Sequence, residues 1–128
     1  MRLLLDTHTL LWFLADDSRL SVKAKAAIED TANERWLSPI SLLEIALKHR
    51  LGKLPLPAPF GILFPASLLA DDIHLLPLEV SHLEPLTTLP LHHRDPFDRV
   101  LAATAIVEEL TLVSVDPAFD LYGLNRLW

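Results

Sequence analysis

Cysteine is absent from this chain of 128 residues. Its absence excludes disulfides, thiolate metal ligands and a cysteine nucleophile, so any metal ion must be held by oxygen or imidazole. Long apolar runs are also missing. The richest stretch, residues 60–70, contains Gly61 and Pro65 and falls short of the ~18 residues that a membrane helix needs. We therefore expect no membrane segment.

The N-terminus does not have the layout of a signal peptide, because its first acidic residue, Asp6, follows only three leucines. The chain is too short for two ordinary domains and long enough for one hydrophobic core. Its hydrophobic fraction of 51% excludes an intrinsically disordered protein. These features predict a single domain over residues 1–128, and the expected location is the cytoplasm.

A positive net charge, which is usual in simple nucleic-acid-binding proteins, is missing as well. The formal net charge is −6, from 17 acidic and 11 basic residues. Four of the acids are assigned below to one site, and without them the balance is nearly neutral. The overall charge therefore neither supports nor excludes a polyanionic substrate. Attraction would have to come from metal ions and a local basic patch.

Short apolar segments alternate with helical patterns along the whole chain. The segments that predict strands are residues 2–5, 35–38, 74–78, 111–115 and 124–128. Helices are predicted at residues 9–15, 21–30, 38–51, 81–86 and 95–109. A further helix of uncertain limits ends near residue 70. This alternation predicts an α/β fold, a three-layer sandwich whose central parallel sheet of four or five strands is flanked by helices.

One helix has well-marked ends. Ser38 is suited to the N-cap, Pro39 to the first helical position, and Gly52 to the residue after the last turn. Its apolar positions predict a buried stripe made of Ile40, Leu43, Leu47 and Leu51. A second face of the same helix, at spacings of three and four residues, carries Ser41, Glu44 and Lys48.

Acidic residues recur where strands end or where the following helices begin. Asp6 directly follows the first predicted strand, and Asp116 directly follows the fourth. Glu44 lies in the helix after the second strand, and Asp98 lies near the start of the long helix. Because the carboxyl ends of parallel strands share one edge of a sheet, where ligands bind, we expect these four side chains to converge.

Each acid also has an ordinary structural explanation. Glu44 could pair with Lys48 on the helix surface. The helix-capping alternative, in which the carboxylate accepts from backbone N–H groups of a first turn, applies to Asp6, Asp95, Asp98 and Asp116. The combination weighs against these single explanations, because Asp6, Glu44, Asp98 and Asp116 are all expected at the same edge of the sheet.

Carboxylates that are packed together repel one another, and some would stay protonated near neutral pH. A divalent cation removes this conflict, and ligation by oxygen alone suits Mg²⁺ or Mn²⁺. The usual chemistry of such a site is phosphodiester hydrolysis, with one or two metal ions activating water and stabilising the leaving oxygen. The sequence therefore predicts a metal-dependent site for phosphate chemistry.

An ordered set of motifs covers nearly the whole chain: Leu-Leu-Leu-Asp-Thr-His at 3–8, Ser-Pro-Ile-Ser-Leu-Leu-Glu-Ile at 38–45, His-Arg-Asp-Pro-Phe-Asp-Arg at 93–99, and Leu-Val-Ser-Val-Asp at 112–116. Any one of them alone is weak, but the ordered set is specific. In this set the chain resembles PIN-domain proteins, of the VapC-like kind found as toxins in bacterial toxin–antitoxin pairs.

The resemblance implies a Mg²⁺-dependent endoribonuclease that hydrolyses RNA phosphodiester bonds, with a cognate antitoxin as partner and a homodimer or higher oligomer as its assembly. It implies that Asp6, Glu44 and Asp98 are the core metal-binding acids and that Asp116 matches a fourth, more variable acidic position. Thr7 and Ser41 match small polar positions that hold water or phosphate. Asp95 belongs to the Asp-Pro-Phe-Asp-Arg signature, where we favour an N-cap over a metal ligand.

The basic residues near these motifs allow two interpretations. Lys48, Arg50 and Lys53 could steer the phosphate backbone of a substrate, or they could form a solvated helix end where basic side chains suit the helix dipole. Arg94 and Arg99 flank the acidic motif and could contact phosphate or pair with acids. We place Lys48 and Arg99 among the candidate substrate-binding residues.

Two further pairs have less specific roles. His92 and His93 are adjacent, and adjacent residues of a regular element point in different directions, so we favour a loop role over a metal pair. Trp12 and Phe13 lie on a helix that is apolar all round, and we assign them to the core. The rest of that helix surface is expected to be a dimer or antitoxin interface, because soluble monomers rarely leave such a patch bare.

Other functions compete with the nuclease. A phosphatase with an aspartate nucleophile would want a second Asp two residues after Asp6, where His8 stands. A phospho-acceptor receiver domain would need a lysine after a late strand, whereas Pro117 follows Asp116. The main alternative is a catalytically inactive PIN-fold interaction module that binds a protein partner, although the full set of acids argues against it.

Overall fold

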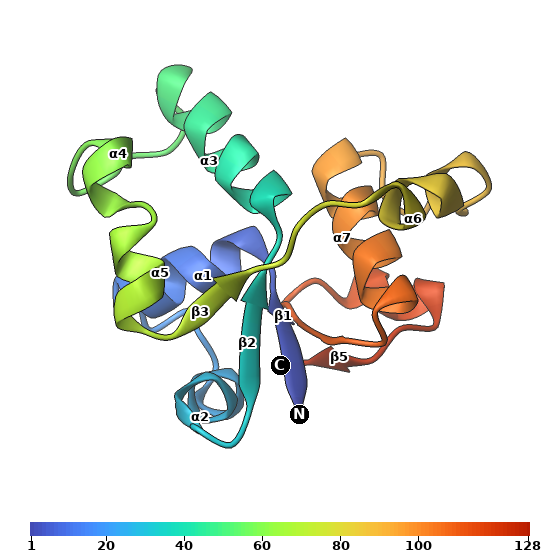
Figure 1. Ribbon diagram of the computed structural model, residues 1–128, viewed down its shortest axis with the longest axis horizontal. Coiled ribbons are helices and arrows are strands. Elements are labelled where there is room, and N and C mark those ends of the chain that lie inside the picture. Colours follow the sequence, from blue (N-terminus) through green and yellow to red (C-terminus); the bar gives the residue numbers. More distant parts are fainter.

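Five short strands form one parallel sheet, seen in a computed structural model that describes residues 1–128 (Figure 1). They are β1 (Arg2–Leu5), β2 (Glu34–Leu37), β3 (Ile73–Leu75), β4 (Thr111–Val113) and β5 (Arg126–Leu127). The strand order is β3-β2-β1-β4-β5, and every neighbouring pair runs parallel. The predicted α/β class with a parallel sheet is confirmed.

Helices connect and flank these strands. They are α1 (Thr7–Leu14), α2 (Val22–Glu29), α3 (Pro39–Arg50), α4 (Phe60–Leu63), α5 (Ala66–Ala70), α6 (Val80–Leu83) and α7 (Pro96–Val107). Two 3₁₀ helices complete the chain, η1 (Glu84–Thr87) and η2 (Pro117–Tyr122). None of the helices combines the length and the apolarity that crossing a bilayer requires.

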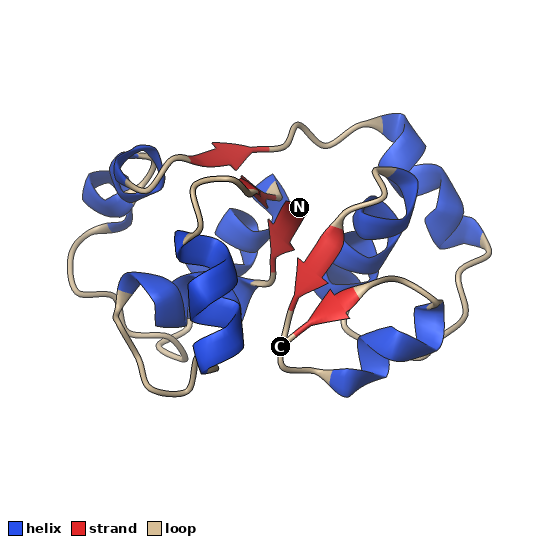
Figure 2. Cartoon of the chain, turned by 90° about the horizontal axis from the view of Figure 1, so that it is seen from below, coloured by secondary structure: helices blue, strands red, loops and turns tan.

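The two faces of the sheet are covered by different groups of helices, which lie on opposite sides of the strands in Figure 2. Successive side chains of a strand point to opposite faces, so β1 contributes to both. Leu3 and Leu5 pack in the core with side chains of α1, α2, α3 and α5, and Leu4 packs with side chains of α7 and η2. The result is the expected three-layer sandwich.

Helix α3 begins and ends at the residues that its sequence predicts. The Ser38 side chain accepts a hydrogen bond from the Ile40 N–H, and Pro39 occupies the first helical position. Gly52 follows the helix with φ at +72°, a left-handed conformation that favours glycine. Its N–H and that of Lys53 close the last turn on carbonyl groups of α3.

The buried face of α3 is not the predicted one. Leu43, Leu47 and Leu51 are 47%, 48% and 66% exposed, whereas Ser41 and Glu44 are buried beside Ile45. The prediction of an apolar buried stripe is therefore wrong for the three leucines, whereas Ile40 is partly buried against the core. Burial of the polar face is tolerated because its hydroxyl and carboxylate groups are hydrogen-bonded to α1.

The later strands are shorter than predicted. β3 ends at Leu75, before Pro77, which has no N–H to donate to a neighbouring strand. β4 ends at Val113, where the chain turns toward η2, and β5 contains only Arg126–Leu127. Each strand therefore stops close to the sheet edge at which the acidic residues lie.

The burial pattern of α3 predicts unequal costs for two truncations on the same helix. Ile45→Ala should destabilise the protein by about 2–5 kcal/mol because Ile45 is completely buried and a cavity remains. Leu47→Ala should change the free energy of unfolding by less than about 1 kcal/mol because its side chain is half-exposed. Urea unfolding of both variants measures the difference, and equal losses would contradict the observed orientation of the helix.

Candidate active site

The four acids predicted to converge lie at the carboxyl edge of the sheet, where β2, β1 and β4 are neighbours. Helices α3 and α7 rise on either side of this edge (Figure 1). Asp98 is close enough to Asp6 and Glu44 for their charges to act on its carboxyl group. Ligand atoms of Asp98 and Asp116 lie within 4.8 Å of each other. The structure thus brings together side chains that are far apart in the sequence.

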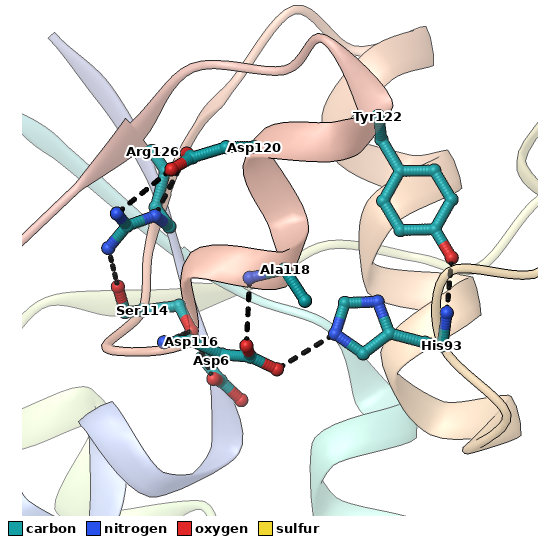
Figure 3. A network of polar contacts seen from close by, with 8 residues as sticks. All are labelled: Asp6, His93, Ser114, Asp116, Ala118, Asp120, Tyr122 and Arg126. Atoms are coloured by element: carbon teal, nitrogen blue, oxygen red, sulfur yellow. Dashed lines mark hydrogen bonds and ion pairs between the residues drawn. The ribbon is translucent and has the colours of Figure 1, made fainter.

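Ser114 links Asp6 to Asp116 (Figure 3). Its hydroxyl donates to Asp6 Oδ2 at 2.7 Å and accepts from the backbone N–H of Asp116 at 3.1 Å. Asp6 is buried, and its side chain makes no capping hydrogen bond to α1. Burial raises the pKa of Asp6 above its ordinary value, although the hydrogen bond from Ser114 opposes this shift.

Glu44 is held by α1 and by its own helix. Thr7 Oγ1 donates to Glu44 Oε1 at 2.8 Å and lies 2.9 Å from Ser41 Oγ. Lys48 Nζ forms an ion pair with Glu44 Oε2, as the surface alternative predicted. Thr7 and Ser41 are buried, and the Thr7 hydroxyl contacts both Ser41 and Glu44. Thr7 thus helps to position an acid, and the expected contact of Thr7 and Ser41 with substrate stays a prediction.

Asp98 lies in the first turn of α7 and is partly buried. Burial, followed by the negative charges of Asp6 and Asp95, raises the pKa of Asp98 to about 7. His93 acts in the opposite direction, but its effect is smaller. A carboxyl group with this pKa carries a proton about half of the time at neutral pH, unless a cation takes its place.

Asp116 is both a cap and a member of the acidic group. Its Oδ1 accepts from the Ala118 N–H at 2.9 Å, and its Oδ2 lies 2.8 Å from His93 Nε2 (Figure 3). Burial acts to raise the pKa of Asp116, but the hydrogen bonds from His93 and Ala118 outweigh it and lower the pKa below its ordinary value. Asp116 therefore stays ionised at neutral pH, where Asp98 is only partly ionised.

Asp95 and Arg99 have structural roles. Asp95 Oδ1 accepts from the Phe97 N–H at 2.8 Å, which makes Asp95 the N-cap of α7, as favoured from the sequence. The Arg99 guanidinium donates to the carbonyl oxygens of Leu86, Leu89 and Pro90. These hydrogen bonds hold the loop before α7, and the expected contact of Arg99 with phosphate stays a prediction.

Lys48 is the basic residue that reaches the acids. Its ammonium group contacts Glu44, its side chain remains 35% exposed, and the hydrogen bond with Glu44 raises the pKa of Lys48. Arg50 and Arg94 are exposed, and Lys53 lines a groove described below. A cationic side chain is thus available beside the acids without a large basic patch.

His93 is the residue of this site that sequence reasoning missed. It is buried and contacts Asp116, whereas the adjacent His92 is exposed and lies edge-on against Tyr122. The two histidines do point in different directions. The partner of His93 lies 23 residues further along the chain, so no local spacing identifies the contact. Its position within the motif at 93–99 is the single signal that could have drawn attention to it.

The donor set fits a hard divalent cation. Asp6, Glu44, Asp98 and Asp116 offer carboxylate oxygens, and Lys48 is the cation in contact with one of them. Oxygen donors of this kind are the preferred ligands of Mg²⁺ and Mn²⁺. The pKa of Asp98 is raised to about 7 by its burial and then by the negative charges of Asp6 and Asp95, and a bound cation would oppose both effects.

A second feature is an apolar groove of ≈ 690 Å³, which none of the four acids lines. It lies between α1, the segment 53–57 and the region of α4 and α5. Its apolar lining includes Leu11, Trp12, Leu14, Leu54, Leu56, Leu63 and Phe64. Trp12 and Phe13 also pack against the core, as predicted for the apolar first helix.

The sequence pattern of the PIN domain family matches residues 3–124 of the chain. A relative of similar length, Ribonuclease VapC22 of Mycobacterium tuberculosis (strain ATCC 25618 / H37Rv), is 33% identical over 114 residues. The aligned part is 88% of this chain and 85% of the relative.

Solved structures share the fold at lower sequence identity. VapBC2 from Rickettsia felis, bound to a DNA fragment from their promoter, has a TM-score of 0.73 and 17% identity, with 99% of this chain and 98% of that chain covered. VapBC-1 from nontypeable Haemophilus influenzae has a TM-score of 0.65 and 15% identity, with 99% and 97% covered. At these identities the likeness concerns the fold.

The raised pKa of Asp98 predicts that the metal-free protein loses stability as pH rises. Its pKa changes from 3.8 to about 7 on folding, so between these values the folded chain binds a proton that the unfolded chain has released. The stability contributed by Asp98 is fully present below the unfolded-state pKa of 3.8. It is lost as the pH rises through the folded-state pKa of about 7. Chemical denaturation in chelator, between about pH 5 and about pH 8, should show this loss.

The matched control is Asp98→Asn, whose amide does not titrate. Relative to this variant, the wild-type chain should become progressively less stable across the pH range, and added Mg²⁺ should reverse the trend in the wild type. If the difference in stability between the wild type and Asp98→Asn stays constant with pH, the pKa of Asp98 is not raised in the folded protein.

Proposed function

The chain belongs to the PIN domain family, and on this basis we propose that it is a metal-dependent endoribonuclease acting as the toxin of a toxin–antitoxin pair. The observation that carries the proposal is the meeting of four acids at one sheet edge, with Asp98 partly protonated at neutral pH. The 33% identity to a protein named a ribonuclease supports RNA as the substrate. An RNA substrate also makes the cytoplasm the proposed location.

We assign the divalent cation, Mg²⁺ with Mn²⁺ as the alternative, to the carboxylates at this edge. The proposed ligands are Asp6, Glu44, Asp98 and Asp116. When bound, such a cation lowers the pKa of water and stabilises negative charge on the reacting phosphate. Ser114 holds the Asp6 carboxylate, and Thr7 and Lys48 hold the Glu44 carboxylate, before a cation binds. Less reorganisation of these side chains is then needed when the cation binds.

The side chains of the protein position the substrate and move the proton. Lys48, partly exposed beside the acids, offers a cation to a phosphate of the RNA backbone. A carboxylate accepts the proton of the attacking water, whose oxygen bonds to phosphorus as the bond from phosphorus to the 3′-oxygen breaks in line. The departing 3′-oxygen takes up a proton from solvent. Neither a histidine nor the 2′-hydroxyl of RNA takes part. The products therefore carry 5′-phosphate and 3′-hydroxyl groups.

The proposed protein partner is an antitoxin that occupies the apolar groove of ≈ 690 Å³. Similar folds occur in VapBC complexes, which supports such a partner. An amphipathic segment of the antitoxin could place its apolar side chains against Trp12, Leu14 and Leu56.

A second copy of the chain is the proposed partner of the outer face of α3. Leu43, Leu47 and Leu51 are exposed on this face, and contiguous exposed apolar side chains commonly mark protein interfaces. The proposed assembly is a homodimer or a higher oligomer.

Substituting the acids should abolish RNA cleavage. Asp6→Asn and Asp98→Asn each remove a charged ligand and should lower the Mg²⁺-dependent cleavage rate by at least about 100-fold while leaving the protein folded. Cleavage of a defined RNA, with sequencing of the product ends, measures the rate and the end chemistry. Ends with 2′,3′-cyclic phosphate would contradict the mechanism.

Asp95→Asn is the matched control, because it makes the same change on the same helix. Asparagine is as good an N-cap as aspartate, so this variant should keep both its stability and most of its activity. If neither the wild type nor any variant cleaves RNA with Mg²⁺ or Mn²⁺ present, the result would favour the alternative of a catalytically inactive interaction module.

A charge in the groove should weaken the antitoxin complex. Leu56→Asp places a carboxylate among apolar side chains and should raise the Kd by at least about 10-fold. Co-expression with candidate antitoxins from the same genome, followed by interferometry on the purified pair, measures the change. Leu69→Asp, at an exposed position of α5, should leave the Kd unchanged, and an equal effect of both would place the partner elsewhere.

A further inference from the structure

We infer that His93 is a positioning residue of the metal site, because its imidazole holds the Asp116 carboxylate in the orientation needed to share a cation with Asp98. The inference rests on the proposed function in one respect, namely that the acids bind a divalent cation. His93 itself lies outside the proposed set of ligands.

The first support is the way in which Asp116 is held. One carboxylate oxygen accepts from the Ala118 N–H at 2.9 Å, and the other lies 2.8 Å from His93 Nε2 (Figure 3). A helix cap requires only the first of these contacts. The second donor fixes the rotation of the carboxylate about its own axis, and each oxygen retains a lone pair for a further partner.

The second support is the way in which His93 itself is held. Its backbone N–H donates to Tyr122 Oη at 2.8 Å. Its ring lies 4.3 Å from the Phe119 ring centroid and stacks on the Tyr122 ring at 5.6 Å with an interplanar angle of 11°. Both aromatic residues belong to η2, the element that Asp116 caps. The imidazole therefore cannot swing away from the carboxylate without losing this packing.

The hydrogen bond has a defined direction. An ionised carboxylate only accepts, so the hydrogen must reside on His93 Nε2. The other ring nitrogen, Nδ1, is buried without a hydrogen-bond partner. The contact of Nε2 with Asp116 is therefore the hydrogen bond that the ring makes. The fold buries this ring although one of its nitrogens has no partner.

The third support is the location of His93 between two acids. Ligand atoms of His93, Asp98 and Asp116 all lie within 4.8 Å of one another. His93 comes from the segment that leads into α7, the helix of Asp98. Two carboxyl groups therefore lie close together, and the Asp116 side chain is 40% exposed. Without a donor on its inner side, Asp116 would turn toward solvent and leave Asp98 alone.

The test uses Mn²⁺ binding without RNA, measured by isothermal titration calorimetry and by electron paramagnetic resonance of the bound ion. His93→Phe keeps a buried ring and removes the donor, and it should weaken Mn²⁺ binding by about 10–100-fold. His93→Gln keeps an N–H donor at a similar reach and should restore affinity to within a few-fold of the wild type. His92→Phe, at the exposed neighbouring position, is the matched control and should bind as the wild type does.

A second pair of variants covers the case in which His93→Phe does not fold. His93→Gln and His93→Met have side chains of equal length, and only the first has a donor. Thermal unfolding establishes that both are folded. The inference predicts tighter Mn²⁺ binding by the Gln variant, a difference that loss of ring packing alone does not produce.

The outcomes separate this inference from the proposed function. A wild-type chain that binds no divalent cation would overturn both. A wild-type chain that binds Mn²⁺, with folded His93→Phe and His93→Met variants that bind it equally well, would overturn the role of His93 alone. Directly bonded ¹⁴N coupling in the resonance spectrum of the bound Mn²⁺ would also overturn it, because His93 would then be a ligand.

Discussion

The repulsion among carboxylates at one edge of the sheet is the constraint on which the rest of the site depends. Parallel strands place their carboxyl ends together, so the acids that follow them cannot avoid one another. Burial makes the conflict stronger because it removes solvent screening. Both effects act on Asp98, whose pKa is raised to about 7 by its burial and then by the negative charges of Asp6 and Asp95.

The neighbours of the acids divide the site into two halves. On the α1 and α3 side, Thr7 and Lys48 hold Glu44. On the α7 and η2 side, His93 holds Asp116 beside Asp98. Ser114 joins the halves through Asp6 and the Asp116 backbone. A cation bound among these acids would complete a frame that the hydrogen bonds have already oriented, as in many metal sites.

Helix α3 must place Glu44 in the site and also contribute apolar side chains to the core, and the two requirements involve different faces of the helix. Because its polar face must be buried to bring Glu44 to the sheet edge, fewer of its leucines can be buried. Leu43 and Leu47 are left half-exposed, and they become available to a partner. Apolar side chains pack on both faces of β1. The stability of this core offsets the repulsion among the acids at the edge of the sheet.

The sequence by itself determined the alternation of strands and helices along the chain, the parallel sheet and the expectation that four acids meet at one of its edges. Periodicity, caps such as Ser38 and Asp95, and strand-end positions are local signals. Only the tertiary structure decided which face of α3 is buried, that Arg99 holds a loop, that Thr7 and Ser41 support Glu44, and that His93 meets Asp116. These outcomes depend on contacts between residues distant in the chain, such as the hydrogen bond from Thr7 to Glu44 and the contact between His93 and Asp116, which no local pattern encodes.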